Sequence, residues 1–337
     1  MKTPRVLVVF NTLTPFPADK DYTAELKQPD WQTEADVARA LTALEFPFEF
    51  AGLCDDLSVL QQKAAAFKPD IIFNLVERFN NNSVYETDFA SHLNLLGVPF
   101  TGCDPAAMTL CKNKGLAKQL LAYHRVRVPQ FVILPVKKPI HRPKRLDFPV
   151  FIKPLREEAS LGISQASFVE NDAQFRERVS FLHETLGQDV IAEEYIPGRE
   201  IYVGILGNRR LEVFPPREMV FARVDDEDPK IATYKAKWDE AYRKKWGIKN
   251  KFADDLPEGL EEKIRTIAKR IYRKLLIRGY ARLDMRLTPE GELVFIEANP
   301  NPMLAKDEDF ALSAQKAGLD YPELIRRILQ LAPAKED

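Results

Sequence analysis

Short apolar runs typical of buried strands alternate with longer segments that carry apolar residues at helical spacing in the first third of the chain. The strand-like runs are residues 5–10, 46–53 and 70–76. The helix-like segments are residues 31–44 and 57–67. This order predicts an α/β fold with a parallel sheet of the doubly wound type in residues 1–110. No G-x-G-x-x-G motif follows the first strand, so we do not expect a nucleotide site there.

Two further sections follow, residues 111–190 and 191–330. The first mixes strand-like runs with a predicted helix at residues 172–186. The second contains a β-hairpin pattern and ends in an amphipathic helix at residues 320–332. Within it, residues 236–252 are charged and irregular, and we expect a mobile surface loop there.

Bulk properties exclude several classes of protein. The 337 residues carry a formal net charge of −1, which gives no general attraction to nucleic acid or to an anionic membrane. The longest apolar runs, such as residues 6–10, are too short to cross a bilayer, and the N-terminus resembles a first strand more than a signal peptide. Three cysteines without C-x-x-C spacing and four scattered histidines argue against disulfides and zinc, so we expect a cytoplasmic protein.

The hairpin segment YARLDMRLTPEGELVFIEANPNP, residues 280–302, has the most unusual chemistry. Its alternating pattern and its Pro/Gly turn predict two antiparallel strands. If the turn takes residues 288–291, Arg282 lies opposite Glu297, with Asp284 on the diagonal and on the same face. A shift of one residue would undo this pairing.

The polar residues of the hairpin allow two interpretations. Asp284, Glu297 and Asn299 offer the hard oxygen ligands that Mg²⁺ prefers. Arg282 cannot be a ligand, but it can meet charge that develops on a reacting substrate. The alternative is a solvated sheet face with a cross-strand salt bridge, and this segment alone does not distinguish the two.

Other charged residues lie at positions that suit a phosphate. Lys153 ends an apolar strand and can reach a phosphate as a point charge, or it can extend from the strand end into water. Ser160 belongs to a loop of small residues whose backbone N–H groups can approach a phosphate. Lys114 and Lys118 lie four residues apart on one predicted helix, and such lysines are usually exposed.

A cluster of acids surrounds a Pro-Gly turn in IAEEYIPGRE. Glu193, Glu194 and Glu200 fit either a solvated linker or a site that hydrogen-bonds an adenine amino group and ribose hydroxyls. Lys237, within TYKAKW, is an ordinary loop lysine when taken alone.

Taken in order, these segments resemble the ATP-grasp ligases, and in particular their D-alanine–D-alanine ligase branch. The matching segments are TGCDPAAMTLCKNKGLAKQLL, FPVFIKPLREEASLGIS, IAEEYIPGRE, YKAKW and ARLDMRL with VFIEANPNP. The resemblance extends from about residue 74 to the C-terminus. It implies three α/β subdomains with boundaries at 1–110, 111–190 and 191–330. The N-terminal subdomain would be Rossmann-like, and ATP would be held between the second and the third.

The resemblance also implies roles for single residues. Positions that match the family's ATP-binding residues are Lys114, Lys153, Ser160, Glu193, Tyr195, Ile196, Glu200 and Lys237. Among these, the first two lysines would contact phosphates, Glu193 would face adenine and Glu200 would bind ribose. Tyr195 and Ile196 would form the strand that links the two ATP-holding subdomains. Lys237 would reach the γ-phosphate once its loop closes.

The remaining matches concern catalysis. Asp284, Glu297 and Asn299 match the magnesium ligands, for which Mn²⁺ can substitute. Arg282 matches the arginine that stabilises the tetrahedral intermediate. The implied reaction joins a carboxylate to an amine through an acyl phosphate made from ATP, which agrees with the need of phosphoryl transfer for metal ions and lysines.

The segments that face the substrate depart from the family. No residue of the loop after the first strand matches the glutamate that grips the first amino acid. Glu158 and Ala159 replace a glycine and a serine of the phosphate loop, and Trp238 replaces a tyrosine. The segment after N-P-N-P lacks the usual Gly-Met and Ser. The candidate residues for an altered substrate site are Glu77, Glu86 and Lys306.

We therefore expect an ATP-dependent carboxylate–amine ligase whose amino-acid or carboxylate and amine substrates differ from two D-alanines. An orthodox D-alanine–D-alanine ligase, a non-catalytic ATP-binding module and an ATP-grasp kinase stay open as alternatives. The resemblance also implies a homodimer, which is common in such ligases.

Overall fold

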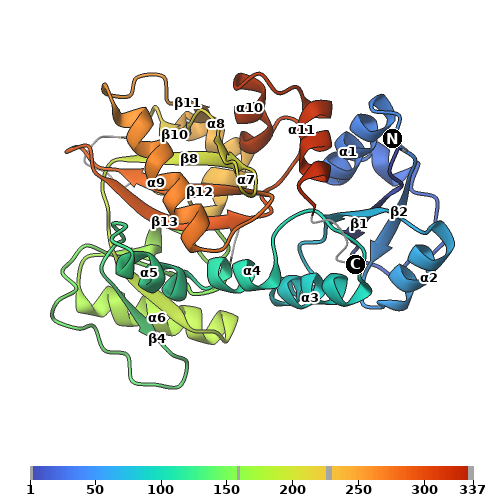
Figure 1. Ribbon diagram of the computed structural model, residues 1–337. Coiled ribbons are helices and arrows are strands. Elements are labelled where there is room, and N and C mark those ends of the chain that lie inside the picture. The colour runs from blue at the N-terminus through green and yellow to red at the C-terminus, as the bar shows by residue number, and fades with distance from the viewer. Residues whose placement is uncertain (1–2, 158–159, 225–229, 333–337) are drawn as a thin grey trace.

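The computed structural model describes residues 3–157, 160–224 and 230–332, whose strands form three separate sheets (Figure 1). The strands and helices predicted above occur within two residues of their expected bounds. The domain boundaries themselves stay a prediction, and the strand β7 (Val190–Glu194) crosses the boundary that we expected at residue 190.

The N-terminal sheet is parallel, as predicted. Its strand order is β2 (Phe48–Leu53), β1 (Val6–Asn11) and β3 (Ile71–Leu75). The helices α1 (Gln32–Ala43) and α2 (Ser58–Phe67) connect these strands. Parallel neighbours need such crossover connections, which explains the regular alternation of the two hydrophobic periods along the chain.

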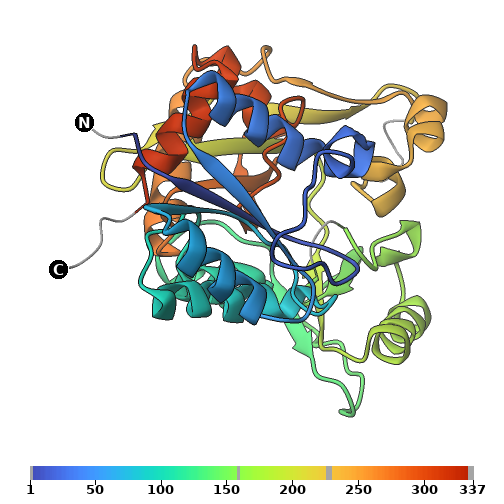
Figure 2. The same cartoon turned by 90° about the vertical axis from the view of Figure 1, so that its right-hand side faces the viewer.

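Helices from both ends of the chain cover this sheet. One face of β1 packs in a common core with α1 and with α11 (Tyr321–Gln330), and the other face packs with α2 and α3 (Glu86–Leu96). Figures 1 and 2 both show α11 beside α1, and the two helices are in contact. The last described helix therefore covers one face of the N-terminal sheet, and the first and last described segments share one core.

The central sheet is antiparallel, with the strand order β4 (Phe131–Leu134), β7, β5 (Val150–Pro154) and β6 (Phe168–Val169). The helix α6 (Asp172–Leu186) covers one of its faces. Two helices, α4 (Pro105–Lys112) and α5 (Lys114–Tyr123), precede this sheet in the chain and contact β13 of the next one.

The C-terminal sheet is also antiparallel. Its strand order is β11 (Ile248–Phe252), β10 (Arg217–Phe221), β8 (Arg199–Leu206), β12 (Tyr280–Leu287) and β13 (Leu293–Pro300), with β9 (Glu212–Val213) beside β8. The helix α9 (Leu260–Lys274) packs on β8, and so does α10 (Asp309–Lys316). The side chains of the buried α9 residues join Val203 and Leu283 in one core.

The prediction of an irregular loop at residues 236–252 is wrong. This segment belongs to the helices α7 (Tyr234–Trp238) and α8 (Glu240–Trp246) and to the edge strand β11. The hydroxyl of Thr233 and the carboxylate of Asp239 accept N–H groups at the helix starts. Tyr242 and Trp246 pack on a small apolar cluster that includes Met219. The apolar residues of this segment are few and are separated by many charged residues, so the sequence pattern did not indicate these elements.

The predicted register of the hairpin is wrong as well. Leu287 pairs with Leu293, because the turn takes one residue more than expected and the N–H of Thr288 donates to the carbonyl of Glu292 over 2.9 Å. A bulge next to Asp284 then leaves Ile296 without a partner on β12.

These two shifts change the pairing at the polar end of the hairpin. Asp284 lies opposite Glu297, and Arg282 lies opposite Asn299, not opposite Glu297 as expected. Directly opposite residues share a sheet face, so the four side chains still lie on one face.

Within the described residues, no helix combines the length and the apolar character that crossing a bilayer requires.

We predict that Gly198→Ala strongly destabilises the fold. A Cβ at Gly198 would lie 2.1 Å from the carbonyl oxygen of Leu287, and Gly198 has a φ of +112°. We expect a loss of about 3 kcal/mol in the free energy of unfolding, measured by urea denaturation. Gly187→Ala is the matched control, because Gly187 has a φ of +63° but open space around it, and we expect a loss of about 1 kcal/mol. Equal losses would contradict the steric argument.

Candidate functional site

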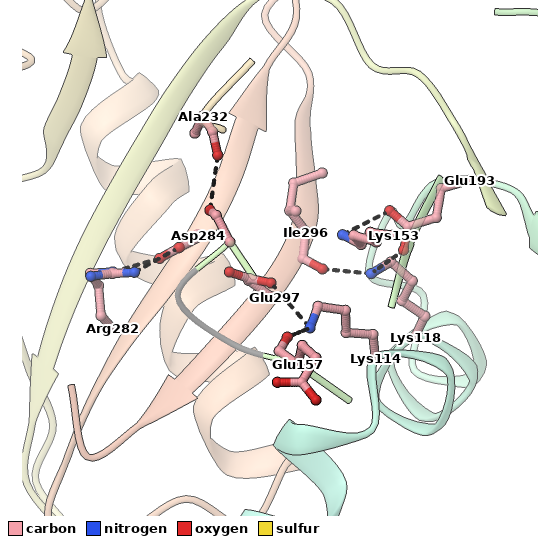
Figure 3. A network of polar contacts seen from close by, with 11 residues as sticks. Lys114, Lys118, Lys153, Glu157, Glu193, Ala232, Arg282, Asp284, Ile296 and Glu297 are labelled. Atoms are coloured by element: carbon pink, nitrogen blue, oxygen red, sulfur yellow. Dashed lines mark hydrogen bonds and ion pairs between the residues drawn. The ribbon is translucent and has the colours of Figure 1, made fainter. Parts of the chain in front are cut away.

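Two carboxylates face each other on the β12–β13 hairpin. Asp284 is buried, and Arg282 holds both of its oxygens through Nε to Oδ1 at 2.7 Å and Nη2 to Oδ2 at 2.9 Å (Figure 3). Glu297 lies directly opposite Asp284. Such a pair is stable only with nearby cations, because like charges at opposite positions of a sheet repel each other.

The surrounding cations keep one of these acids strongly ionised. Burial opposes ionisation of Glu297, but Lys114, Lys153 and Lys237 lower the pKa of this carboxyl group to about 2. Burial raises the pKa of Asp284, and the Arg282 guanidinium opposes this rise. Glu297 is therefore surrounded by more positive charge than it can balance by itself.

Lys114 reaches the hairpin from the first turn of α5. The Asn113 side chain caps this helix by accepting the N–H of Leu116, which starts the helix at Lys114. The Lys114 ammonium lies 3.7 Å from a carboxylate oxygen of Glu297 and donates to the carbonyl of Glu157. The buried lysine thus connects α5, the loop after β5 and β13.

A second junction has Glu193 at its centre (Figure 3). One carboxylate oxygen lies 2.9 Å from the ammonium group of Lys118 and the other lies 3.1 Å from that of Lys153. Lys118 also donates over 2.5 Å to the carbonyl of Ile296, the bulge residue of β13. One ammonium group therefore joins the central sheet to the C-terminal sheet.

Lysines four residues apart on a helix are usually exposed, but Lys114 and Lys118 are not. Both are buried, and Lys118 has no exposed surface. Burial lowers the pKa of Lys118 to about 8, although Glu193 opposes this change. Lysines four residues apart share one helix face, but only the packing of both sheets around α5 shows that this face is buried.

The helix α7 brings Lys237 to the same place. Its ammonium lies 5.9 Å from the ring centre of Tyr202, and the guanidinium of Arg282 lies 5.0 Å from that ring. The segment before α7 is anchored, because the hydroxyl of Ser160 donates to the carbonyl of Ala232 over 2.9 Å. The loop after β5 and the segment before α7 therefore meet above the hairpin.

Arg286, which the sequence interpretation did not single out, holds the connection between the two sheets. Its Nε donates to the carbonyl of Ile196 over 2.9 Å, and its Nη1 lies 3.3 Å from a carboxylate oxygen of Glu200. The Tyr202 hydroxyl donates to the other oxygen of Glu200 over 2.9 Å. The alternation of Arg282, Asp284 and Arg286 along β12 was the signal that could have found it.

One pocket gathers most of the predicted site residues. Those that line it are Lys153, Ser160, Glu193, Tyr195, Ile196, Glu200, Lys237, Asp284 and Glu297. Lys114 pairs with Glu297 and Arg282 pairs with Asp284. Asn299 lies two residues after Glu297 on β13. The predicted residues Glu158 and Ala159 lie outside the described residues.

The hairpin carboxylates fit a hard divalent cation. They occupy facing positions, and in the described part of the chain the side-chain nitrogen of Asn299 is buried without a hydrogen-bond partner, so this amide can turn its oxygen toward the pair. The described residues contain no group of three His, Cys, Asp or Glu side chains that could hold a metal. An ion here would thus depend on Asp284, Glu297, Asn299 and oxygens of a ligand or water.

A second cavity, of about 440 Å³, lies at the carboxyl ends of β1 and β3. The predicted substrate candidates Glu77 and Glu86 line it, together with Glu34 from the first turn of α1, which the sequence interpretation missed. Burial and the charge of Glu77 raise the pKa of Glu34 to about 7. Lys306 is exposed and does not line this cavity.

Comparison with known proteins identifies the family. Residues 110–330 match the family model described as D-ala D-ala ligase C-terminus. The chain belongs to the D-alanine–D-alanine ligase family. A Sinorhizobium fredii protein described as uncharacterized protein y4sG is 32% identical over 266 residues, which cover 78% of this chain and 74% of that protein. D-alanine–D-alanine ligase A of Chromobacterium violaceum is 30% identical over 250 residues, which cover 72% of this chain and 64% of that ligase.

Solved structures agree on the fold of this family member. D-alanine–D-alanine ligase from Bacillus anthracis, complexed with ATP, matches with a TM-score of 0.74 and 19% identity, over 98% of this chain and 97% of that one. VanG D-Ala:D-Ser ligase from Enterococcus faecalis matches with a TM-score of 0.71 and 19% identity, over 98% and 99%. The predicted ATP-grasp α/β architecture is thereby confirmed.

We predict that Lys118→Met destabilises the protein by about 3 kcal/mol, because it leaves Glu193 with one lysine and the carbonyl of Ile296 without its donor. Urea denaturation at pH 7 measures this change. Lys144→Met removes an exposed lysine and serves as the control. A loss below about 1 kcal/mol would mean that the junction contributes little to stability.

We predict that Glu34→Gln stabilises the protein at high pH only. The raised pKa means that the folded protein holds the proton more tightly than the unfolded chain, so stability is lost as pH rises from about 4.5 to about 7. Glutamine removes this loss. Urea denaturation should show a gain of about 2 kcal/mol at pH 8 and none at pH 4. A gain that is equal at both pH values would contradict the assignment to this carboxyl group.

Proposed function

We propose that the protein is an ATP- and Mg²⁺-dependent ligase that joins a carboxylate to an amine through an acyl phosphate. The observation that supports this most directly is the pocket in which the facing pair Asp284 and Glu297 meets Lys114, Lys153 and Lys237. This combination suits a triphosphate, because the lysines would balance its charge and the carboxylates would hold the metal ion that accompanies it.

The lysines are placed before the nucleotide arrives. Glu297 holds Lys114 and Glu193 holds Lys153, so neither ammonium group has to be ordered at the moment of binding. When ATP binds, its phosphate oxygens would pair with the ammonium groups of Lys114 and Lys153. Glu200, fixed by Arg286 and Tyr202, offers an oriented carboxylate to the ribose hydroxyls.

Asp284, Glu297 and Asn299 would hold Mg²⁺, or Mn²⁺ in its place, and the ion would neutralise charge on the transferring phosphoryl group. Arg282, two residues before Asp284 on β12, donates a hydrogen bond to the Asp284 carboxylate and so orients it. Tyr195 and Ile196 would line the adenine side of the pocket next to Glu193, and Ser160 would lie near the phosphates.

In the reaction, an oxygen of the substrate carboxylate forms a bond to the γ-phosphorus of ATP while the bond to the β-phosphate oxygen breaks and ADP leaves. The amine then bonds to the acyl carbon and loses a proton, and inorganic phosphate leaves. Arg282 stabilises the oxyanion of this second step. Lys237, on α7, meets the γ-phosphate and shields the acyl phosphate from water.

Named relatives support a ligase and leave the substrates open. One relative is a D-alanine–D-alanine ligase, and one structural neighbour is a D-Ala:D-Ser ligase. Within our proposal, Glu77 and Glu86 face the substrate in the second cavity, and Lys306 has no such support. The homodimer and the cytoplasmic location stay predictions.

We predict that Mg-ATP releases ADP only when a suitable carboxylate and amine are present, in a panel of D- and L-amino acids with products identified by mass. Asp284→Asn should lower kcat at least about 100-fold, because it weakens the site for the ion that stabilises the phosphoryl group. Asp254→Asn changes an exposed carboxylate and should leave kcat unchanged.

Three outcomes separate the alternatives. Formation of D-alanyl-D-alanine alone would mean an orthodox ligase. A phosphorylated hydroxyl product would mean a kinase. Binding of ATP without ADP release under any substrate would contradict the proposal and favour a non-catalytic module.

A further inference from the structure

A buried arginine on α6 holds the loop that follows β5. Arg178 is 7% exposed, and its Nη2 donates to the carbonyl of Gly162 and, over 3.1 Å, to the hydroxyl of Ser167. Its helix neighbours Phe175 and Val179 pack in the core of the central sheet. Arginine is almost never fully buried unless it is paired, so packing alone does not explain its presence at this position.

The charge of Arg178 has no counterion in the described chain. Its described hydrogen-bond acceptors are a carbonyl and a hydroxyl, which are neutral, and its Nε is buried without a described partner. Burial lowers the pKa of the guanidinium, and no described charge opposes this change. A buried cation without a carboxylate is costly, so an anion that binds nearby would offset a cost which the described residues leave in place.

The loop that Arg178 holds has the backbone of an anion-binding turn at residues 160–163. Ser160 and Gly162 are both left-handed, with φ of +61° and +72°, and the N–H of Ile163 donates to the carbonyl of Ser160 over 3.0 Å. A left-handed serine is strained and persists only where its surroundings impose it. No described group accepts the N–H of Ser160, Leu161 or Gly162. Successive N–H groups in such a turn form a concave site for an anion.

This turn belongs to the wall of the pocket that is proposed to hold ATP. Ser160 and Ile163 line that pocket together with Lys153. Gly162 lies between the two lining residues, and its carbonyl oxygen would repel a phosphate. Because Arg178 engages this oxygen, the turn can offer its N–H groups to a phosphate without presenting the carbonyl as well.

The same turn anchors the segment before α7. The hydroxyl of Ser160 donates to the carbonyl of Ala232 over 2.9 Å, and the N–H of Tyr234 donates to the carbonyl of Ile163 over 3.4 Å. Tyr234 is the first residue of α7, which carries Lys237. A chain of hydrogen bonds therefore runs from α6 through the turn to the helix of the lysine that is proposed to meet the γ-phosphate.

We propose that Arg178 is a positioning residue for the triphosphate of ATP. It fixes the turn at residues 160–163 so that the N–H groups of the turn meet phosphate oxygens, and the bound phosphates balance its buried charge. Arg178 acts through the turn and does not contact the nucleotide. The inference rests on the proposed ATP site and adds a residue of α6 to it.

The test compares a nucleotide that carries a triphosphate with one that does not. Calorimetric titration measures the binding of Mg-ATP and of AMP to the wild type and to Arg178→Met. We expect Arg178→Met to weaken Mg-ATP binding at least about tenfold and AMP binding less than about threefold, because AMP lacks the β- and γ-phosphates.

Arg176→Met is the matched control, because Arg176 is an exposed arginine two residues earlier on α6 and its substitution removes the same charge. It should leave the binding of both nucleotides unchanged. Equal weakening of Mg-ATP and AMP in Arg178→Met would mean a structural role only and would overturn the proposal. Unchanged binding of Mg-ATP in Arg178→Met would overturn it as well.

Urea denaturation shows whether Arg178→Met folds. If it does not fold, Arg178→Lys decides by the same comparison, because lysine keeps the charge but is shorter and lacks the planar fork of the guanidinium. Mg-ATP binding should then weaken at least about threefold more than AMP binding. A smaller difference would overturn the proposal.

Binding also separates this inference from the ligase proposal. If Mg-ATP binds but no carboxylate and amine of the panel cause ADP release, the ligase proposal loses its support and the comparison of Arg178 variants still decides. If the wild type does not bind Mg-ATP, the inference about Arg178 is overturned.

Discussion

The buried carboxylate of Glu193 is the interaction on which the rest of the site depends. It balances two lysines that have almost no contact with water, and one of them, Lys118, continues to the bulge of β13. A buried charge without a partner costs several kcal/mol, so the three groups stay together or the local packing changes. This requirement fixes the central sheet against the C-terminal sheet at the place where the lysines and acids must meet.

The bulge at Ile296 shows how a local irregularity serves this junction. It exposes one carbonyl for Lys118, and it brings Glu297 opposite Asp284. A regular hairpin with the same sequence would place Glu297 opposite a different residue and would direct the Ile296 carbonyl into the ladder of strand hydrogen bonds. The contact between the sheets and the carboxylate pair thus have one structural cause.

The two cavities lie in different parts of the molecule. The pocket between the central and C-terminal sheets is lined by residues within 110–330, the segment that matches the D-alanine–D-alanine ligase family, to which the chain belongs. The cavity at the N-terminal sheet is lined by acids that include Glu34 on α1 and Glu77, two residues after β3. The buried polar groups of each pocket select their own ligand, so residues of one cavity can change without a change to the chemistry of the other.

The sequence by itself determined the parallel N-terminal sheet, most helices and strands, the shared face of Arg282, Asp284, Glu297 and Asn299, and the family. These features depend on local periodicity and on motifs of neighbouring residues. The bulge of the hairpin, the burial of Lys118 and the position of Glu34 in the wall of the second cavity were decided by the tertiary structure alone. Each depends on segments far apart in the chain, such as α5 in contact with β13, or α1 and the end of β3 in the wall of one cavity. No local pattern records which faces those segments bury.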